Sequence, residues 1–365
     1  MRRRFLPDLC LASSPHGPVG VGCAVAILLV GFSFTAALAL TAQNRANAPT
    51  SWTVTIVLPP KLMAGHPATL AVLGVDGKLA PGVRVELSDG QTVTTDRTGR
   101  AIFSVPSTGE FLLAKGSGAS AAALIDPAVA ESEPKAVTLP PIVSVHDRFW
   151  ICGAGLRGRA EEDHVAINGQ PAAMLAASPV CLVVLAAPSA RLGAASVAAQ
   201  APGVQWNAQT TLVSLQFVPP NPALKPGQKG QLVIRALGSD EKIRIIVENQ
   251  TPEVLRFMRG DVQELITSGG SENSARLEVQ ASSSGTFSFG ARLLPAPDPP
   301  TAERYLRAAA TLAPSDLRRR ISGLARRVAQ HPRDAEALRV EVQRLATSTL
   351  AGDFRTLLEA AQGAL

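Results

Sequence analysis

Apolar and polar residues alternate with a period of two through most of the chain after Pro49. Successive side chains of a β-strand point to opposite faces, so this alternation predicts half-buried strands. Turn-forming pairs such as Asp76-Gly77 interrupt the alternation, and short strands separated by such turns are typical of antiparallel sandwiches. The pattern divides into residues 50–135, 139–217 and 218–297, and we expect one β-sandwich in each.

From Thr301 onward the apolar residues recur with the period of an α-helix. One stripe consists of Leu317, Ile321, Leu324 and Val328. Such a stripe predicts amphipathic helices, here three or four over residues 300–365, and it must be buried against another surface. The proline-rich residues 295–300 predict an extended linker before the first helix.

The N-terminal region has a different pattern. Between Val19 and Ala42 the chain is almost wholly apolar and carries no charged residue. These residues make a helix of about 36 Å, which exceeds the ~30 Å hydrocarbon core of a bilayer. We therefore expect a transmembrane anchor or signal segment over residues 18–42, after a short basic cytoplasmic segment at residues 1–17.

The flanking charges predict the orientation of this segment. Three arginines precede it, whereas only Arg45 follows it closely. By the positive-inside rule the N-terminus stays in the cytoplasm and the bulk of the chain is exported, to the periplasm or the cell surface. The apolar run is longer than a usual signal h-region, but Ala46-Asn47-Ala48 offers a cleavage site. Both a retained single-pass anchor and a cleaved, secreted form stay open.

Residues 80–118 carry a recognisable pattern inside the first predicted sandwich. Pro-Gly-Val-x-Val at 81–85 is followed by Thr-Asp-x-x-Gly-x-Ala-x-Phe at 95–103. This segment resembles the carboxypeptidase regulatory-like and Cna-B-like sandwich families. The resemblance implies a β-sandwich for residues 50–135 and says little about function.

Residues 139–217 resemble an IPT/TIG domain, which is an immunoglobulin-like sandwich. The resemblance rests on Val-x-Ile-Asn-Gly at 165–169, on a strand that Ser178-Pro179 opens, and on a strand that ends in Gly153-Ala154-Gly155. The family serves in protein contacts of cell-surface receptors and enzymes, and in DNA binding in some transcription factors. Export excludes the DNA role, so no nucleic-acid partner is expected.

These observations together predict the fold class. It is mainly β, with tandem immunoglobulin-like β-sandwiches between an N-terminal transmembrane helix and a C-terminal α-helical region. The third sandwich, residues 218–297, resembles no family that we can name.

Two cysteines are candidates for a disulfide bond. Cys152 and Cys181 both lie on predicted strands of the second sandwich. Strands of an immunoglobulin-like sandwich can be neighbours in one sheet, and an exported protein permits the bond. Closing this loop would stabilise the fold by about 3–4 kcal/mol. Two buried free thiols are the alternative.

The chain offers no catalytic set, cofactor motif or metal-ligand spacing. Gly153-x-Gly155-x-x-Gly158 matches a dinucleotide fingerprint, but another strand and no helix is predicted after it, so we interpret it as a turn. The five histidines are scattered singly, without zinc spacing. We therefore expect a protein that is not an enzyme, without a cofactor or bound metal.

The net charge of +6 comes mainly from arginine. Residues 301–365 hold eleven Arg and no Lys, against seven Asp or Glu. This surplus fits either a contact with an acidic partner or anionic envelope polymer, or a merely solvated helix face.

The sequence thus predicts a non-enzymatic, membrane-anchored cell-envelope protein that presents immunoglobulin-like modules for protein contacts, adhesion or scaffolding. One alternative is a polysaccharide-binding surface protein that uses Trp52, Trp150 and Trp206 for stacking. Another is an accessory subunit of an envelope enzyme or transport complex, which docks through its C-terminal helices. The partner itself is not predicted.

Overall fold

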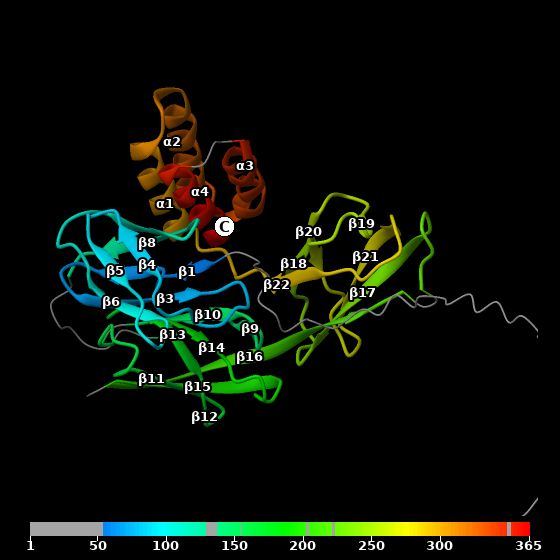
Figure 1. The fold of residues 1–365 in the computed structure, drawn as a ribbon, viewed down its shortest axis with the longest axis horizontal. Coiled ribbons are helices and arrows are strands. Elements are labelled where there is room, and N and C mark those ends of the chain that lie inside the picture. The colour runs from blue at the N-terminus through cyan, green and yellow to red at the C-terminus, as the bar shows by residue number, and fades with distance from the viewer. Residues whose placement is uncertain (1–53, 129–136, 154, 202–203, 221–222, 349–351) are drawn as a thin grey trace, which may run out of the picture. The chain divides into compact units, whose positions relative to one another are not determined.

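The computed structural model describes residues 54–128, 137–153, 155–201, 204–220, 223–348 and 352–365. Strands occupy the chain as far as Leu293, and helices follow from Pro299 (Figure 1). The predicted mainly β class with a C-terminal helical part is therefore confirmed in this general form. The predicted membrane segment, Val19 to Ala42, lies outside the described residues. Within them, no helix has both the length and the apolar character that a membrane span requires.

The first sandwich pairs a small sheet with a larger one. The small sheet consists of β1 (Thr55–Val57), β3 (Pro67–Leu73) and β6 (Arg100–Ser104). The larger sheet has the order β2 (Lys61–Met63), β8 (Ala119–Asp126), β7 (Phe111–Gly116), β4 (Arg84–Leu87) and β5 (Thr92–Thr94). Alternation decides which side chains enter the core: Ala101 and Phe103 are buried, whereas Ile102 between them is exposed.

The second sandwich follows the same principle. One sheet consists of β10 (Arg148–Cys152), β14 (Cys181–Leu185) and β13 (Ala173–Ala177). The other consists of β12 (Gln170–Pro171), β11 (His164–Ile167), β15 (Gly193–Ala201) and β16 (Val204–Val218), with β9 (Ile142–Ser144) parallel to β16. Asn168 and Gly169 both have positive φ and form the two-residue turn between β11 and β12.

The third sandwich begins inside the last strand of the second. It has one sheet of β16, β17 (Lys229–Leu237), β21 (Ser274–Ala281) and β19 (Leu255–Phe257), and another of β20 (Val262–Ile266), β18 (Arg244–Asn249) and β22 (Phe289–Leu293). Residues 214–218 of β16 pair with β17, and the earlier residues of β16 pair with β15. One strand thus crosses the expected boundary at 217/218, because no turn interrupts the alternation there, and β16 serves both sandwiches.

The first and second sandwiches are also joined by main chain. Ala177 of β13 pairs with Thr69 of β3, which makes the small sheet continuous with β13, β14 and β10. A separate apolar cluster fills this junction, formed by Val57, Ala71, Leu73, Leu175, Ala176 and Val183. The Ser178 hydroxyl donates to the Lys61 carbonyl at 2.7 Å. The junction is thus packed like a protein core.

Gly158 lets the chain approach closely at this junction. The Thr69 hydroxyl donates to the Gly158 carbonyl at 2.9 Å. Gly158 has φ +73, and a Cβ added there would lie 2.2 Å from the carbonyl oxygen of Pro67. Only glycine fits both the conformation and the space.

The helical region consists of α1 (Pro299–Leu312), α2 (Ser315–Gln330), the short 3-10 turn Pro332–Asp334, α3 (Ala335–Ser348) and α4 (Asp353–Ala364). The Asp298 side chain caps α1 by accepting from Thr301 N at 3.2 Å. Pro299 and Pro300 occupy the first turn of α1, where a missing N–H costs nothing. The predicted linker over 295–300 is therefore shorter than expected.

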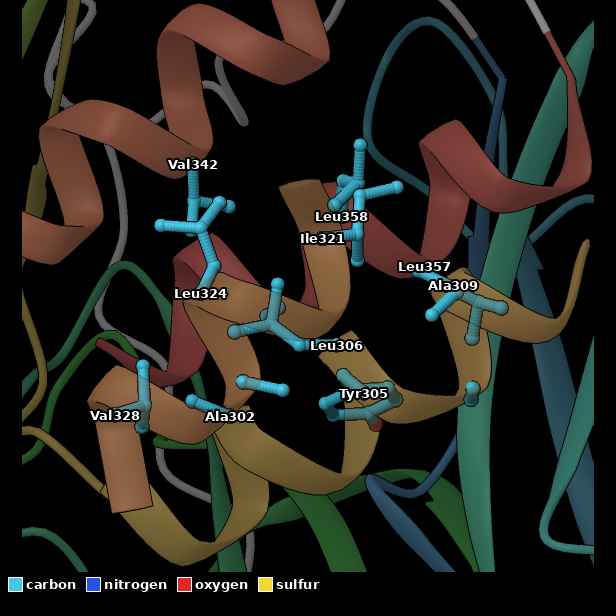
Figure 2. Close-up of a cluster of buried hydrophobic side chains, with 14 of the residues drawn as sticks. Ala302, Tyr305, Leu306, Ala309, Ile321, Leu324, Val328, Val342, Leu357 and Leu358 are labelled. Atoms are coloured by element: carbon cyan, nitrogen blue, oxygen red, sulfur yellow. The ribbon is translucent and has the colours of Figure 1, made fainter. Parts of the chain in front are cut away.

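The apolar stripes of the helices meet in one buried cluster, which Figure 2 shows around Leu306, Leu324 and Leu358. The cluster extends to Leu113 of β7 and Leu124 of β8, and so reaches the larger sheet of the first sandwich. Their chain neighbours Leu112 and Ala123 face the sandwich core instead. The middle of β7 and of β8 is therefore buried on both faces, whereas β4 and β5 keep one exposed face.

Polar contacts fix the helices on both the first and the third sandwich. The Tyr305 hydroxyl donates to the Pro60 carbonyl at 3.2 Å, and Arg304 pairs with Asp126 at 2.5 Å. On the other side, Glu264 of β20 pairs with Arg339 of α3, whose side chain is 6% exposed. Because Arg339 is nearly inaccessible, this pairing is required to bury its charge.

We expect Gly158→Ala to destabilise the protein more than Gly169→Ala. Both glycines have nearly the same positive φ, but a Cβ at Gly169 has nothing within 4 Å. The conformational cost of about 1–2 kcal/mol is then common to both, and overpacking adds about 1–3 kcal/mol at Gly158 alone. Chemical denaturation of the two variants measures the difference. Equal losses would contradict the close contact with Pro67.

Candidate functional site

The structure brings Cys152 and Cys181 together. They are directly opposite each other on β10 and β14 and are joined by a disulfide bond. The main chain of Cys152 exchanges hydrogen bonds with Thr138, and that of Cys181 bonds to Ser178. Both cysteines thus direct their backbone groups away from each other. They form a non-hydrogen-bonded pair, the closer of the two antiparallel arrangements, and their Cα atoms are 4.1 Å apart.

The glycines that resemble a dinucleotide fingerprint serve the junction described above. Gly155 and Gly158 have positive φ, and the chain continues through a turn into β11 at His164. A dinucleotide site needs a helix N-terminus at this point to bind the pyrophosphate. The described residues around Gly155 and Gly158 therefore fit a turn and do not fit a dinucleotide site.

The two described tryptophans, Trp150 and Trp206, do not form a common exposed platform. Trp206 is buried in the second sandwich, whereas Trp150 on β10 is 37% exposed. Trp52 lies outside the described residues. Stacking of sugars on several rings is typical of polysaccharide sites, and Trp206 is inaccessible for that purpose.

Across the described ranges, no group of three or more His, Cys, Asp or Glu side chains is placed to hold a metal ion. His16 lies outside those ranges.

A cleft of about 480 Å³ lies between the first and second sandwiches. Thr98 and Arg100 line it from one side, and Asp163, His164 and Gln200 line it from the other. Arg100 donates from Nε to the Met174 carbonyl at 3.0 Å and so fastens the two sandwiches. Sequence reasoning missed this cleft because residues from two modules, far apart in the chain, form it.

Asp163 is the unusual group of this cleft. Its side chain is 2% exposed, and its carboxylate accepts from the Arg157 N–H at 3.1 Å. Burial raises the pKa of Asp163 to about 6, although hydrogen bonds from the Arg157 and Gly158 N–H groups oppose the change. A buried carboxyl that titrates near pH 6 makes this junction sensitive to pH.

A second hollow, a groove of about 730 Å³, lies between α1 and α2. Arg307 lines it from α1, and Arg318 and Arg326 line it from α2. The larger apolar residues of α2, among them Ile321 and Leu324, are buried in the helical cluster and do not line the groove. Part of the arginine surplus seen in the sequence is therefore gathered in a concave surface.

Not every arginine of the helices belongs to this groove. Arg327 pairs with Glu341 at 2.7 Å, and Arg355 pairs with Glu359 at 2.9 Å. These exposed pairs are the ordinary solvated surface of helices and contribute little to stability.

No protein-family model matches the chain, and no curated protein matches it. Among solved structures, the chain is similar to the plexin A4 full extracellular region at 12% identity and a TM-score of 0.25, covering 66% of this chain and 23% of plexin. It is similar to the N-terminal four Ig domains of Dscam1 at 10% identity and a TM-score of 0.20, covering 66% and 72%.

A third solved structure is the SGBP-B protein of a Bacteroides ovatus mixed-linkage glucan utilization locus, in complex with a heptasaccharide. It is 13% identical with a TM-score of 0.19, covering 63% of this chain and 58% of that protein. The chain spans about a quarter of the plexin A4 structure named above. Likeness at these TM-scores carries no argument about function, and the IPT/TIG and carboxypeptidase regulatory-like resemblances stay predictions.

We expect the disulfide to be present in the protein isolated from cells. Mass spectrometry of the unreduced protein should yield one crosslinked peptide pair that contains Cys152 and Cys181, and alkylation of both should require reduction. Reduction should cost about 3–4 kcal/mol of stability, because the closed loop restricts the unfolded chain. A pair that is alkylated without reduction would contradict this expectation.

We also expect Asp163 to make stability depend on pH. The folded pKa of about 6 lies above the usual 3.8, so between these values the unfolded chain releases a proton that the folded chain keeps. Stability from this group is therefore full below about pH 4, falls as the pH rises to about 6, and is constant above; at about 1.4 kcal/mol per pKa unit the loss is at most roughly 3 kcal/mol.

The control for this expectation is Asp163→Asn, which keeps an oxygen to accept from Arg157 N–H but does not titrate. The difference in unfolding free energy between wild type and variant, followed from pH 4 to pH 8, isolates this group because the others are common to both. A difference that does not change with pH would show that Asp163 is not the source.

Proposed function

We propose that the protein is a non-enzymatic, membrane-anchored and exported cell-envelope protein that presents its sandwiches for protein contacts or scaffolding. One observation carries the proposal: the modules are joined through shared sheets. Strand β16 belongs to two sandwiches, and the pairing of Thr69 with Ala177 links the first and second. Such joints hold successive surfaces together, which suits a scaffold.

The sequence supports this role and its location. The apolar residues from Val19 to Ala42, preceded by three arginines, favour a single-pass anchor with the bulk exported. The resemblance of residues 139–217 to an IPT/TIG domain supports protein contacts. The pairing of Cys152 with Cys181 is consistent with an oxidising compartment.

The alternative of an accessory subunit that docks through its helices keeps a structural basis, with one change. The apolar stripe of the helices is buried against the first sandwich. A partner of the helical region would therefore meet a polar, arginine-bearing surface. The polysaccharide alternative rests on Trp150 alone among the described tryptophans.

Cell fractionation, N-terminal sequencing and a reporter fused to the C-terminus test the proposal together. We expect the protein in the membrane fraction, with an intact N-terminus and a reporter that is active only outside the cytoplasm. Sequencing that starts near Ala48 would identify the secreted form instead. A reporter that is active only in the cytoplasm would overturn the proposal.

A further inference from the structure

We infer that the groove between α1 and α2 binds an acidic polypeptide segment. The inference rests on the proposed role in protein contacts and names the chemistry of a partner. It is drawn from the shape of the groove, from the charges that line it and from its length.

The floor of the groove consists of small side chains. Ala310 of α1 and Ala325 and Ala329 of α2 line it, and a methyl group is too small to fill the space. Ala310 and Ala325 also belong to the buried helical cluster, whereas Ala329 is exposed. The result is an open channel whose apolar floor is the edge of that cluster.

The walls of the groove are cationic. Arg307, Arg318 and Arg326 supply three positive charges, and Glu303 is the one acidic residue among the lining side chains. Glu303 pairs with Arg307 at 2.5 Å, which leaves a surplus of two positive charges. Arg318 and Arg326 are exposed. Guanidinium groups bind carboxylates through two parallel hydrogen bonds, so aspartate and glutamate side chains fit these walls.

The apolar floor distinguishes a polypeptide from the other anions of a cell envelope. A polyphosphate chain has no apolar group to place against Ala310, Ala325 and Ala329. A lipid headgroup surface is broad and nearly flat, and it favours protruding apolar side chains over a channel. In a polypeptide segment that mixes acidic and apolar residues, the acidic side chains can pair with the arginines of the walls and the apolar side chains can pack on the alanines of the floor.

The length of the groove sets the size of the segment. The lining residues of α2 extend from Arg318 to Gln330, which corresponds to about 18 Å at 1.5 Å per residue. An extended peptide rises about 3.3 Å per residue, so five or six residues fill it.

The test measures binding of a fluorescein-labelled ten-residue peptide that combines Asp and Glu with Leu and Ala. The protein is the full-length chain in phosphatidylcholine nanodiscs, and fluorescence anisotropy reports the dissociation constant. Arg318→Glu/Arg326→Glu reverses two charges in the groove. Arg319→Glu/Arg320→Glu makes the same change of charge on α2 at residues that do not line the groove, and equal melting temperatures check that both variants fold.

We expect the groove variant to weaken peptide binding at least about tenfold, because two groups that donate charge-assisted hydrogen bonds are replaced by groups that repel the acidic peptide. The matched variant should weaken it less than about threefold, through general electrostatics alone. A counterpart peptide with Lys in place of every acid should not bind.

Three outcomes would overturn the inference. One is equal loss in the two variants, which would indicate a diffuse positive surface. Another is no binding of the acidic peptide. The last is tighter binding of polyphosphate or phosphatidylglycerol vesicles than of the peptide, which would assign the groove to a different anion. None of these three outcomes affects the result of the reporter experiment. If the groove does not bind the peptide, the proposed location and role of the protein still stand.

Discussion

Two strands of the first sandwich, β7 and β8, are buried on both faces, and the arrangement of the helices depends on this. Leu112 of β7 points into the sandwich core, and Leu113 next to it points into the helical cluster. A strand that is buried on both sides needs a second layer over its outer face. The helices supply that layer, and in doing so they bury the apolar stripe that would otherwise require a partner.

The consequence for function is that the exposed surface of the helices is mainly polar, with Leu312 and Val340 as the large apolar residues exposed on the described helices. Hydrophobic docking through the helical stripe is excluded by its internal packing. The arginine-lined groove between α1 and α2 is accessible, and its alanines Ala310 and Ala325 form the edge of the buried cluster. One amphipathic pattern therefore has two results: apolar side chains are buried between the helices, and arginine side chains lie on their surface. The arginine side chains make that surface suited to binding carboxylates.

The junctions between sandwiches show how the modules depend on each other. Gly158 admits the Pro67 carbonyl, and Arg100 fastens onto the Met174 carbonyl. Each contact has a main-chain carbonyl on one side, so it requires close approach together with a particular residue on the other side, glycine at 158 or the Arg100 guanidinium. The same junction holds Asp163 away from water, and its raised pKa follows from that burial.

Periodicity in the sequence was sufficient for the class of each element, because burial of one face imposes a period of two on strands and 3.6 on helices. It also placed Cys152 and Cys181 on strands and located the helical stripe. It could not reveal that β16 serves two sandwiches, that the stripe packs on β7 and β8, or that arginines converge in a groove. Those features depend on contacts between residues far apart in the chain, which only tertiary packing decides.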